Sequence, residues 1–235
     1  MKKSFIISGS NSELAKGVAI KLKRKYDLIF LYHSKQNKIE KKLENEIKIK
    51  NSLEDNIDDL YKKIKNKSKN VHAIIHFNGV HKFKTLKSVN RNDFNDIFEI
   101  NCLTFVKLVK LSYYLDKIQS ILSISSVSSK TGNKGISLYS SSKAALNNLV
   151  KSASLELAGK NIRVNNIILG HIERGMGKKT QNYLNEQQLK DLRNRHPLGF
   201  GKVEDLFYML DFLLDSKKSR WITGSELVLD GGYLA

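Results

Sequence analysis

Short apolar segments alternate along this chain with longer stretches in which apolar residues recur every three or four positions. The seven short apolar segments lie at residues 3–8, 27–32, 46–49, 71–77, 120–126, 162–169 and 226–229. Most are apolar nearly throughout, which is typical of strands that are buried on both faces. Between the first two segments, Leu14, Val18 and Leu22 repeat at helical spacing. The pattern therefore predicts an α/β fold, with a parallel sheet covered by helices on both faces.

The chain shows no linker, internal repeat or change of composition that would mark a second domain. Its 235 residues are enough for one domain with a sizeable core. We therefore expect a single domain over residues 1–235. The only proline, Pro197, lies in a polar stretch at about 173–200, which we interpret as a loop-and-helix insertion.

The formal net charge of +18 raises the possibility of nucleic-acid binding. The lysines are spread through the chain, however, and the densest run, residues 61–70, carries one aromatic residue and no nucleic-acid motif. We expect a basic surface that attracts phosphorylated cofactors or acidic carriers, and no nucleic-acid partner. No apolar run approaches the roughly 18 residues that span a bilayer, so no membrane partner is expected. Cys102 is the only cysteine, which excludes an internal disulfide and fits a cytoplasmic protein.

The segment SGSNSELAKG, residues 8–17, joins the first predicted strand to the first predicted helix. In open α/β sheets, a nucleotide pyrophosphate binds at this turn, on the free N–H groups of the helix. Gly9 permits a tight turn, and Ser10, Asn11 and Ser12 can cap the helix or donate hydrogen bonds to phosphate. A single glycine at such a turn is also common for purely structural reasons.

Tyr139 and Lys143 stand four residues apart in SLYSSSKAAL, so both side chains lie on one helix face. A nearby lysine cation favours the phenolate and lowers the pKa of a tyrosine. A serine hydroxyl could hold a substrate oxygen while the phenol donates a proton to it. Ser126, at the end of a predicted strand, is the best placed serine. The alternative is an ordinary helix start with a half-buried tyrosine.

Asn101 interrupts the apolar stripe of a predicted helix at residues 91–116. A polar amide that faces the interior must find hydrogen-bond partners. It could bond to a helix carbonyl, or it could hold a water molecule next to Lys143.

Together these segments resemble the short-chain dehydrogenases/reductases, in particular the 3-oxoacyl-carrier-protein reductases. The resemblance covers nearly the whole chain and rests on six ordered motifs. These are INCLTF at 100–105, ISS at 124–126, YSSSKAAL at 139–146, NIRVNNIILGHI at 161–172, HPLGFGKVEDL at 196–206 and WITGSELVLDGG at 221–232.

The resemblance implies a Rossmann-type, doubly wound parallel sheet of about seven strands and hydride transfer between a nicotinamide and a carbonyl or alcohol carbon. It gives catalytic roles to Asn101, Ser126, Tyr139 and Lys143. Tyr139 would be the acid/base, and Lys143 would lower its pKa and bind the nicotinamide ribose. The implied cofactor-binding residues are Gly9, Ser10, Ser12, Glu13, Leu14, Ser34, Asn51, Ser52, Asn78, Gly79, Tyr139, Lys143, Gly170 and Ile172. No metal site is implied.

The chain departs from the family pattern at several cofactor positions. Glu13 and Ala15 replace the second and third glycines of the usual Gly-x-x-x-Gly-x-Gly turn, and a carboxylate at position 13 would repel a pyrophosphate unless it points outward. His76 to Gly79 replace Asn-Asn-Ala-Gly, with only the glycine kept in place. Leu169 replaces a proline, and Arg174 stands where many relatives carry a threonine that holds the carboxamide.

NAD-preferring relatives often carry an acid after the second strand, whereas this chain has His33, Ser34 and Lys35. We therefore favour NADP(H), with NAD(H) as the alternative. The expected function is reduction of a carbonyl in a small-molecule or carrier-bound substrate, either a 3-oxoacyl thioester or a keto-sugar-like compound. The alternative is a non-catalytic nucleotide-binding or partner subunit on the same fold. The resemblance also implies a substrate lid around 173–200 and a homo-oligomer, a tetramer or a dimer.

Overall fold

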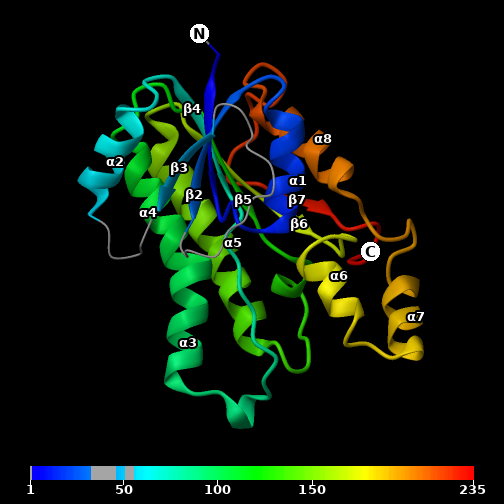
Figure 1. The fold of residues 1–235 in the computed structure, drawn as a ribbon. Coiled ribbons are helices and arrows are strands. Elements are labelled where there is room, and N and C mark those ends of the chain that lie inside the picture. Colours follow the sequence, from blue (N-terminus) through cyan, green and yellow to red (C-terminus); the bar gives the residue numbers. More distant parts are fainter. Residues whose placement is uncertain (1, 33–45, 51–55) are drawn as a thin grey trace.

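Seven parallel strands form the sheet at the centre of the computed structural model, which describes residues 2–32, 46–50 and 56–235 (Figure 1). The strands are β1 (Ser4–Ser8), β2 (Asp27–Tyr32), β3 (Glu46–Lys50), β4 (Val71–His76), β5 (Ser120–Ile124), β6 (Arg163–Leu169) and β7 (Glu226–Leu229). Their spatial order is β3-β2-β1-β4-β5-β6-β7, and every neighbouring pair is parallel. The predicted fold class is confirmed, because this is a doubly wound Rossmann-type sheet.

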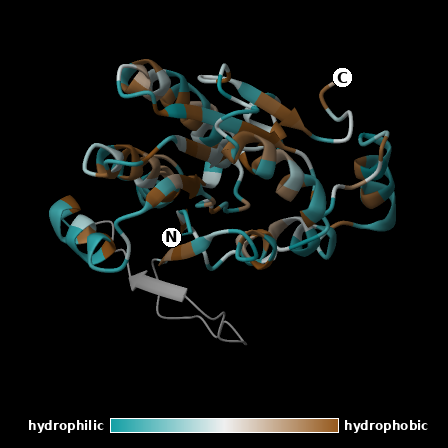
Figure 2. Cartoon of the chain, turned by 90° about the horizontal axis from the view of Figure 1, so that it is seen from above, coloured by the Kyte–Doolittle hydropathy of each residue, from teal (hydrophilic) through white to brown (hydrophobic). Residues whose placement is uncertain are grey.

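Helices cover both faces of this sheet. They are α1 (Glu13–Leu22), α2 (Ile57–Lys65), α3 (Arg91–Phe98), α4 (Thr104–Ser112), α5 (Ser137–Ala158), α6 (Met176–Gln181), α7 (Glu186–Asn194) and α8 (Val203–Leu214). Figure 2 shows a largely apolar sheet between helices that mix apolar and hydrophilic residues. Alternate residues of the strands contribute to two hydrophobic cores, one on each face of the sheet. Ile6 packs with α2, α4 and α5, whereas Phe5 and Ile7 pack with α1 and α8. Burial on both faces explains the nearly unbroken apolar runs.

The chain reverses its direction of strand addition between β1 and β4, which lie side by side at the middle of the sheet. The segments that follow these two strands leave on opposite faces, so a crevice opens beyond their carboxyl ends. Gly9 follows β1, and Asn78 and Gly79 follow β4. The topology therefore brings three of the predicted cofactor-binding residues to one edge of the sheet.

The helix predicted at residues 91–116 is not a regular α-helix throughout, which corrects the sequence-based expectation. A π-helical turn at Glu99–Leu103 separates α3 from α4. Such turns insert one extra residue into the helical ladder and are frequent at functional sites. Here the turn carries Asn101 inward, where the side chain is fully buried.

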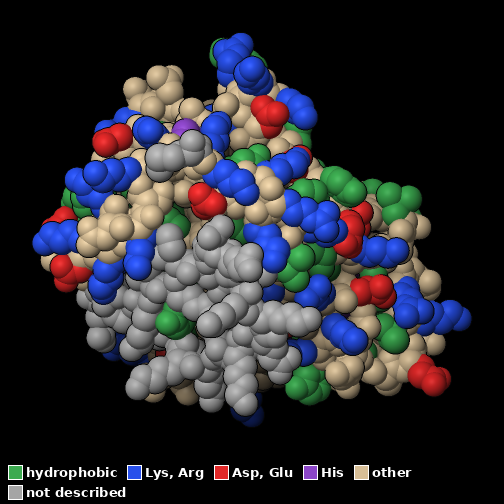
Figure 3. Space-filling model, turned by 45° about the horizontal axis from the view of Figure 1, so that its top comes forward, with side chains coloured by type: hydrophobic (Ala, Val, Ile, Leu, Met, Phe, Trp, Pro, Cys, Tyr) green, Lys and Arg blue, Asp and Glu red, His purple; other side chains and the backbone are tan. Residues whose placement is uncertain are grey.

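The basic residues of the described surface are not concentrated on one element. On the face drawn in Figure 3, Lys and Arg side chains are spread over most of the described area. Within residues 2–32, 46–50 and 56–235, no helix combines the length and apolar character needed to cross a membrane. The stretch at 173–200 contains α6 and α7, in agreement with the expected loop-and-helix insertion.

Candidate active site

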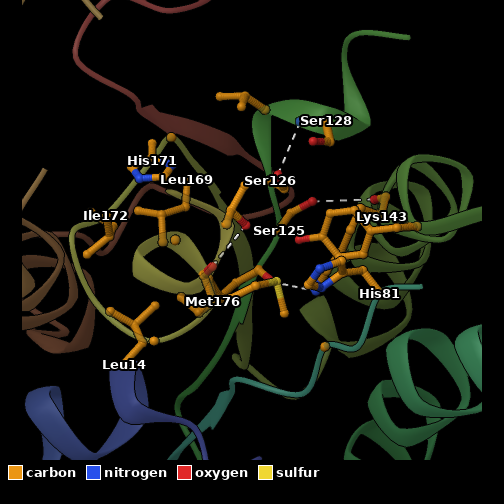
Figure 4. Close-up of a pocket in the computed structure, with 18 of the residues that line it drawn as sticks. Leu14, His81, Ser125, Ser126, Ser128, Lys143, Leu169, His171, Ile172 and Met176 are labelled. Carbon is orange, nitrogen blue, oxygen red and sulfur yellow. Dashed lines mark hydrogen bonds between the residues drawn. The ribbon is translucent and has the colours of Figure 1, made fainter. Parts of the chain in front are cut away.

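A cavity of about 330 Å³ opens at the carboxyl ends of β1, β4, β5 and β6. Its walls come from the α1 turn, the segments after β4, β5 and β6, the start of α5, and the region of α6 and α7. Figure 4 shows His81 and Lys143 on one side of this cavity, with Leu169, His171 and Ile172 opposite them. The lining includes Ser12, Glu13, Leu14, Gly79, Ser126, Tyr139, Lys143, Gly170 and Ile172. Most of the predicted site residues therefore meet in one cavity.

Tyr139 and Lys143 lie one turn apart at the start of α5, and both side chains line the cavity. The ammonium nitrogen of Lys143 lies 6.0 Å from the centroid of the Tyr139 ring. Ser126 faces them from the end of β5, where its hydroxyl accepts a hydrogen bond from the amide of Ser128 at 3.1 Å. The spacing of four residues in the sequence thus predicts the observed arrangement.

The pKa of Tyr139 is raised, which corrects the expectation that Lys143 would lower it in the free protein. Burial of the phenol is the main cause, and hydrogen bonding with Ser126 opposes it by a smaller amount. A raised pKa keeps the phenol protonated at neutral pH. Tyr139 is therefore suited to donate a proton to a bound oxygen rather than to accept one.

The Lys143 side chain is only 3% exposed, and its ammonium donates hydrogen bonds to two main-chain carbonyls. The acceptors are the oxygens of Ile124 at 2.9 Å and Asn78 at 3.2 Å. Burial lowers the pKa of Lys143 to about 8. Gly79 makes room for this side chain, because a Cβ at position 79 would lie 3.2 Å from Nζ. Gly79 and Asn78 thus hold the lysine in the free protein.

Asn101 is buried as predicted, but its side chain is fully engaged in hydrogen bonds with the protein. Its Oδ1 accepts from the amide of Val80 at 2.8 Å, and its Nδ2 donates to the Val80 carbonyl at 3.0 Å and to the Ser142 hydroxyl at 2.9 Å. Asn101 therefore joins the π-helical turn to the segment after β4 and to α5. A water molecule next to Lys143 would therefore have to bond with the main chain of Asn101 rather than with its side chain.

Asn147, one turn beyond Lys143, organises the serine-rich end of β5 and was not identified from the sequence. Its Oδ1 accepts from Ser125 at 2.6 Å and from Asn166 at 2.7 Å, while its Nδ2 donates to Ser129 at 2.9 Å. This network fixes the turn that presents Ser126. The available signal was an amide within the apolar run of α5, as at Asn101.

His76 is a second buried group that sequence reasoning did not place in the site. Its ring is fully buried at the end of β4, and Nδ1 lies 3.1 Å from the Ser8 hydroxyl. Nε2 has no hydrogen bond of good geometry, although it lies close to the Asn101 main chain and the Asn78 side chain. Burial, aided by the charge of Lys143, lowers the pKa of His76 to about 3, so the ring is neutral.

The turn after β1 is tight and packs closely against the segment after β4. Gly9 has a φ of +68°, and a Cβ there would lie 2.7 Å from the amide nitrogen of Asn78. Ser12 caps α1 by accepting a hydrogen bond from Ala15 at 3.1 Å. The Ser10 hydroxyl is buried and donates to the Leu31 carbonyl at 3.1 Å, so it is not directed at a phosphate. The expected side-chain contact from Ser10 is therefore corrected.

Glu13 points outward and is paired with two cations. Its carboxylate lies 2.7 Å from the Lys16 ammonium and 3.7 Å from the Arg174 guanidinium. The hydrogen bond with Lys16 is the main cause of its lowered pKa. The repulsion that a glutamate would exert on a pyrophosphate is thus partly cancelled. Arg174 lies against the start of α1 rather than deep in the cavity, since its guanidinium is also close to Gly17.

The loop after β6 is held by the end of the chain. A Cβ at Gly170 would lie 2.6 Å from the Cα of Asp230, so only glycine fits. The Asp230 carboxylate accepts from the amides of Gly232 and Leu234, each at 2.9 Å. Ile172 is buried and pairs with Gly201 in an isolated bridge. The terminal Asp-Gly-Gly thus closes around the predicted nicotinamide segment.

Three side chains connect this loop to α6 and α7. The His171 ring lies 2.8 Å from the Gln181 side chain, and its amide donates to His196 Nε2 at 3.2 Å. His196 is buried, and its Nδ1 bonds to the Leu192 carbonyl at 2.8 Å. Burial lowers the pKa of His171 to about 4. Both histidines line the cavity, although neither was predicted as a site residue.

Three predicted cofactor contacts, Ser34, Asn51 and Ser52, lie outside the described residues. Within the described residues, no group of three or more His, Cys, Asp and Glu side chains is placed to hold a metal ion.

Comparison with known proteins agrees with this geometry. A short-chain dehydrogenase model, described as enoyl-(acyl carrier protein) reductase, matches residues 10–234. The chain belongs to the short-chain dehydrogenase/reductase family. Among curated members of this family, it is 39% identical over 104 residues to 3-oxoacyl-acyl-carrier-protein reductase FabG of Thermotoga maritima. That match spans 44% of this chain and 40% of the Thermotoga protein.

A longer match within the short-chain dehydrogenase/reductase family is the FabG of Buchnera aphidicola. It is 29% identical over 242 aligned positions and covers 98% of this chain and 97% of that protein. Among solved structures, ElxO with NADP bound superposes with a TM-score of 0.86 at 26% identity, covering 100% of this chain and 99% of ElxO. The fold and the ordered motifs therefore extend over the whole chain.

Proposed function

We propose that this short-chain dehydrogenase/reductase is an NADP(H)-dependent carbonyl reductase. One observation carries the proposal: Ser126, Tyr139 and Lys143 line the same cavity, beside the crevice where β1 and β4 diverge. A binding protein would not need a protonated phenol, a serine hydroxyl and a buried ammonium in one cavity.

The roles follow from the chemistry of the three side chains. The bound nicotinamide supplies the hydride to the carbonyl carbon. Ser126 donates a hydrogen bond to the carbonyl oxygen and orients it. Tyr139, protonated in the free protein, donates its proton to that oxygen as negative charge develops. Lys143 then stabilises the phenolate with its charge, and it also binds the nicotinamide ribose.

Asn101 and His76 act by holding the site together. The Asn101 side chain fixes the π-helical turn against Val80 and α5. Its main chain would hold the water of the proton relay. His76 stays neutral between Ser8 and the π-helical turn, so it adds no charge next to Lys143.

The residues present fit a dinucleotide at the crevice. Gly9 allows close approach of the turn, and the N-terminus of α1, with its cap at Ser12 and with Leu14 facing the cavity, offers free N–H groups to the pyrophosphate. Further contacts are expected from Asn78 and Gly79 on one side and from Gly170 and Ile172 on the other. Arg174 is near enough to this turn to add a positive charge.

The preference for NADP(H) over NAD(H) rests on the sequence after β2, where Ser34 and Lys35 stand without an acid. ElxO, which resembles the chain over its full length, has NADP bound. Changing Ser34 and Lys35 to alanine should weaken NADPH binding more than NADH binding, since only NADPH presents a 2′-phosphate. Equal losses for both cofactors, measured by fluorescence titration, would remove this preference.

For the substrate, the FabG relatives favour a 3-oxoacyl thioester on an acidic carrier, and a keto-sugar-like compound is the second candidate. The segment around 173–200 acts as a lid over this substrate. Of its basic residues, only Arg174 lines the cavity, and it pairs with Glu13 at the cofactor end. We therefore propose that the positive charge of the lid, carried by Arg174, interacts with the cofactor phosphates rather than with the substrate.

We further propose a homo-oligomer, a tetramer or a dimer, built through the helices at 91–116 and 139–158. Phe94, Leu103 and Leu155 on these helices are 46%, 45% and 79% exposed. The single cysteine, Cys102, is buried and free, which suits a reducing cytoplasm.

The experiment that tests the function is a carbonyl panel assayed with NADPH, together with an NADPH titration. Turnover of any ketone, with NADPH bound, supports a reductase. Binding of NADPH without turnover of any carbonyl would favour a non-catalytic subunit, and absence of NADPH binding would contradict both.

A further inference from the structure

A row of aromatic rings runs outward from Tyr139, along the cavity wall at His81 and Phe83 and then beyond the lining to Tyr183. The His81 ring lies 5.9 Å from the Tyr139 ring and 4.9 Å from the Phe83 ring, in edge-on contacts. The Phe83 ring in turn lies 6.3 Å from that of Tyr183. We refer to His81, Phe83 and Tyr183 as the aromatic row. It begins next to Tyr139, the residue proposed to donate the proton, and ends at Tyr183 on the segment after α6.

The outer part of the aromatic row is strongly exposed. Phe83 and Tyr183 are 57% and 78% exposed, although large aromatic side chains usually bury most of their surface. The two rings come from different segments, one after β4 and one after α6, so no local sequence constraint requires them to meet. A ligand that packs against both would remove a large apolar area from water.

The aromatic row carries no charged side chain. Lys82 and Lys84, which flank Phe83, are turned away and bound to carboxylates of α3: Lys82 to Asp93 at 3.0 Å and to Asp96 at 2.7 Å, and Lys84 to Asp93 at 2.6 Å. The two cations that line the cavity are also engaged, Lys143 with main-chain carbonyls and Arg174 with Glu13. This wall is therefore suited to an uncharged group.

His81 is the polar member of the aromatic row. Its ring lines the cavity. Burial lowers its pKa, so the ring is neutral at neutral pH and offers one donor and one acceptor. Its ring lies 5.9 Å from that of Tyr139, and Figure 4 shows His81 beside Lys143, so it faces the part of a substrate nearest the reacting carbonyl.

We propose that the aromatic row is the substrate subsite. It selects uncharged carbonyl compounds that carry a ring or another flat apolar group on one side of the carbonyl and a hydrogen-bonding group close to it. Phe83 and Tyr183 bind the flat group, and His81 binds the second polar group. The inference rests on the proposed function, because the reacting carbonyl is the one that faces Tyr139.

Two β-keto esters that share the second carbonyl isolate the contribution of Phe83 and Tyr183. Ethyl benzoylacetate carries a phenyl ring where ethyl acetoacetate carries a methyl group. The ratio of their kcat/KM values with NADPH should favour the phenyl compound in the unchanged protein, and it should fall roughly tenfold in Phe83→Ala and in Tyr183→Ala. Tyr208→Ala is the matched control, since this 66% exposed tyrosine on α8 neither lines the cavity nor packs against an aromatic ring that does.

His81 is tested with propiophenone, an aryl ketone that lacks the second carbonyl. His81→Leu should lower kcat/KM for ethyl benzoylacetate by about tenfold and leave the value for propiophenone nearly unchanged. His81→Gln should restore part of the loss because it keeps a donor and an acceptor. Each variant must also bind NADPH with unchanged affinity, which shows that the cofactor end of the site is folded.

The outcomes separate this inference from the function on which it rests. If the unchanged protein reduces another carbonyl compound of the panel but none of these three ketones, the reductase stands and the inference about the aromatic row fails. If it binds NADPH but reduces no carbonyl compound at all, the proposed function fails and the inference fails with it. If the ketones are reduced but both ratios are the same in all variants, the reductase stands and the aromatic row is not a specificity site. Equal loss on all substrates in His81→Leu would likewise overturn its assigned role.

Discussion

The ammonium of Lys143 is directed at the carbonyl oxygens of Asn78 and Ile124, and it lies 6.0 Å from the centre of the Tyr139 ring on the same helix. In the free protein, the lysine side chain is thus held by hydrogen bonds at the carboxyl ends of β4 and β5. Its burial lowers its own pKa, while the phenol of Tyr139 keeps a raised pKa. The pair is arranged to hold a proton on Tyr139 before the reaction starts.

The lowered pKa of Lys143 predicts a specific dependence of stability on pH. The folded-state pKa is about 8, below the ordinary lysine value of 10.5, so between these values the unfolded state binds more protons than the folded state. The free energy of unfolding should therefore rise with pH across this window because of Lys143. Below pH 8, Lys143 is charged in both the folded and the unfolded state, so folding bears the full free-energy cost of burying this charge.

Lys143→Met is the matched variant for this prediction, since every other titrating group is retained. The difference in unfolding free energy, wild type minus variant, should shift in favour of the wild type as the pH rises from 8 to 10 in urea denaturation. A difference that stays constant over this window would show that the pKa of Lys143 is not lowered.

Glu13 and Arg174 predict opposite effects on cofactor binding. Glu13→Gln removes a carboxylate beside the expected pyrophosphate and releases Arg174, so NADPH should bind about two- to fivefold more tightly at low salt. Arg174→Gln should weaken NADPH binding by a similar factor. Both effects should shrink as salt is raised, because the pair is 40–49% exposed. Changes of the same sign in the two variants, in a fluorescence titration, would contradict this account.

The lid is tested by hydrogen exchange over residues 173–195. Gly175 has a φ of +60°, and a Cβ at Gly177 would meet the carbonyl oxygen of Ile172, so both glycines shape the entry to α6. We expect NADP(H) to increase the protection of this segment, since Arg174 lies at the cofactor end of the cavity. Unchanged protection would leave a surface insertion instead of a lid. Residues 203–214, on α8, serve as an internal reference.

The fold was predictable from the sequence because a strand that is buried on both faces is apolar at nearly every position, and each such run can be seen within a single short segment. The segments at 27–32 and 226–229 coincide with β2 and β7, and the others match their strands within two residues at each end. The pairing of Tyr139 with Lys143 was predictable for the same reason, since four residues make one helical turn. Asn101 was located by the apolar stripe that it interrupts.

The remaining features depend on contacts between distant segments. The partners of Asn101, the network around Asn147 and the burial of His76 arise where three or more segments converge, and no local spacing encodes that convergence. The raised pKa of Tyr139 was missed because the sequence shows the nearby lysine but not the depth of burial. Likewise, Glu13 points outward because Lys16 and Arg174 hold it there, and Arg174 is far away in sequence.

The measurement that most directly tests the central claim compares wild type and Tyr139→Phe in NADPH-dependent reduction of ethyl benzoylacetate and acetoacetyl-coenzyme A. The account predicts that kcat falls at least about 100-fold in the variant, since the proton donor is lost. NADPH affinity and the free energy of unfolding should stay close to the wild-type values, because phenylalanine keeps the ring and removes only the hydroxyl that bonds with Ser126. Turnover near the wild-type rate in Tyr139→Phe would contradict the assigned mechanism.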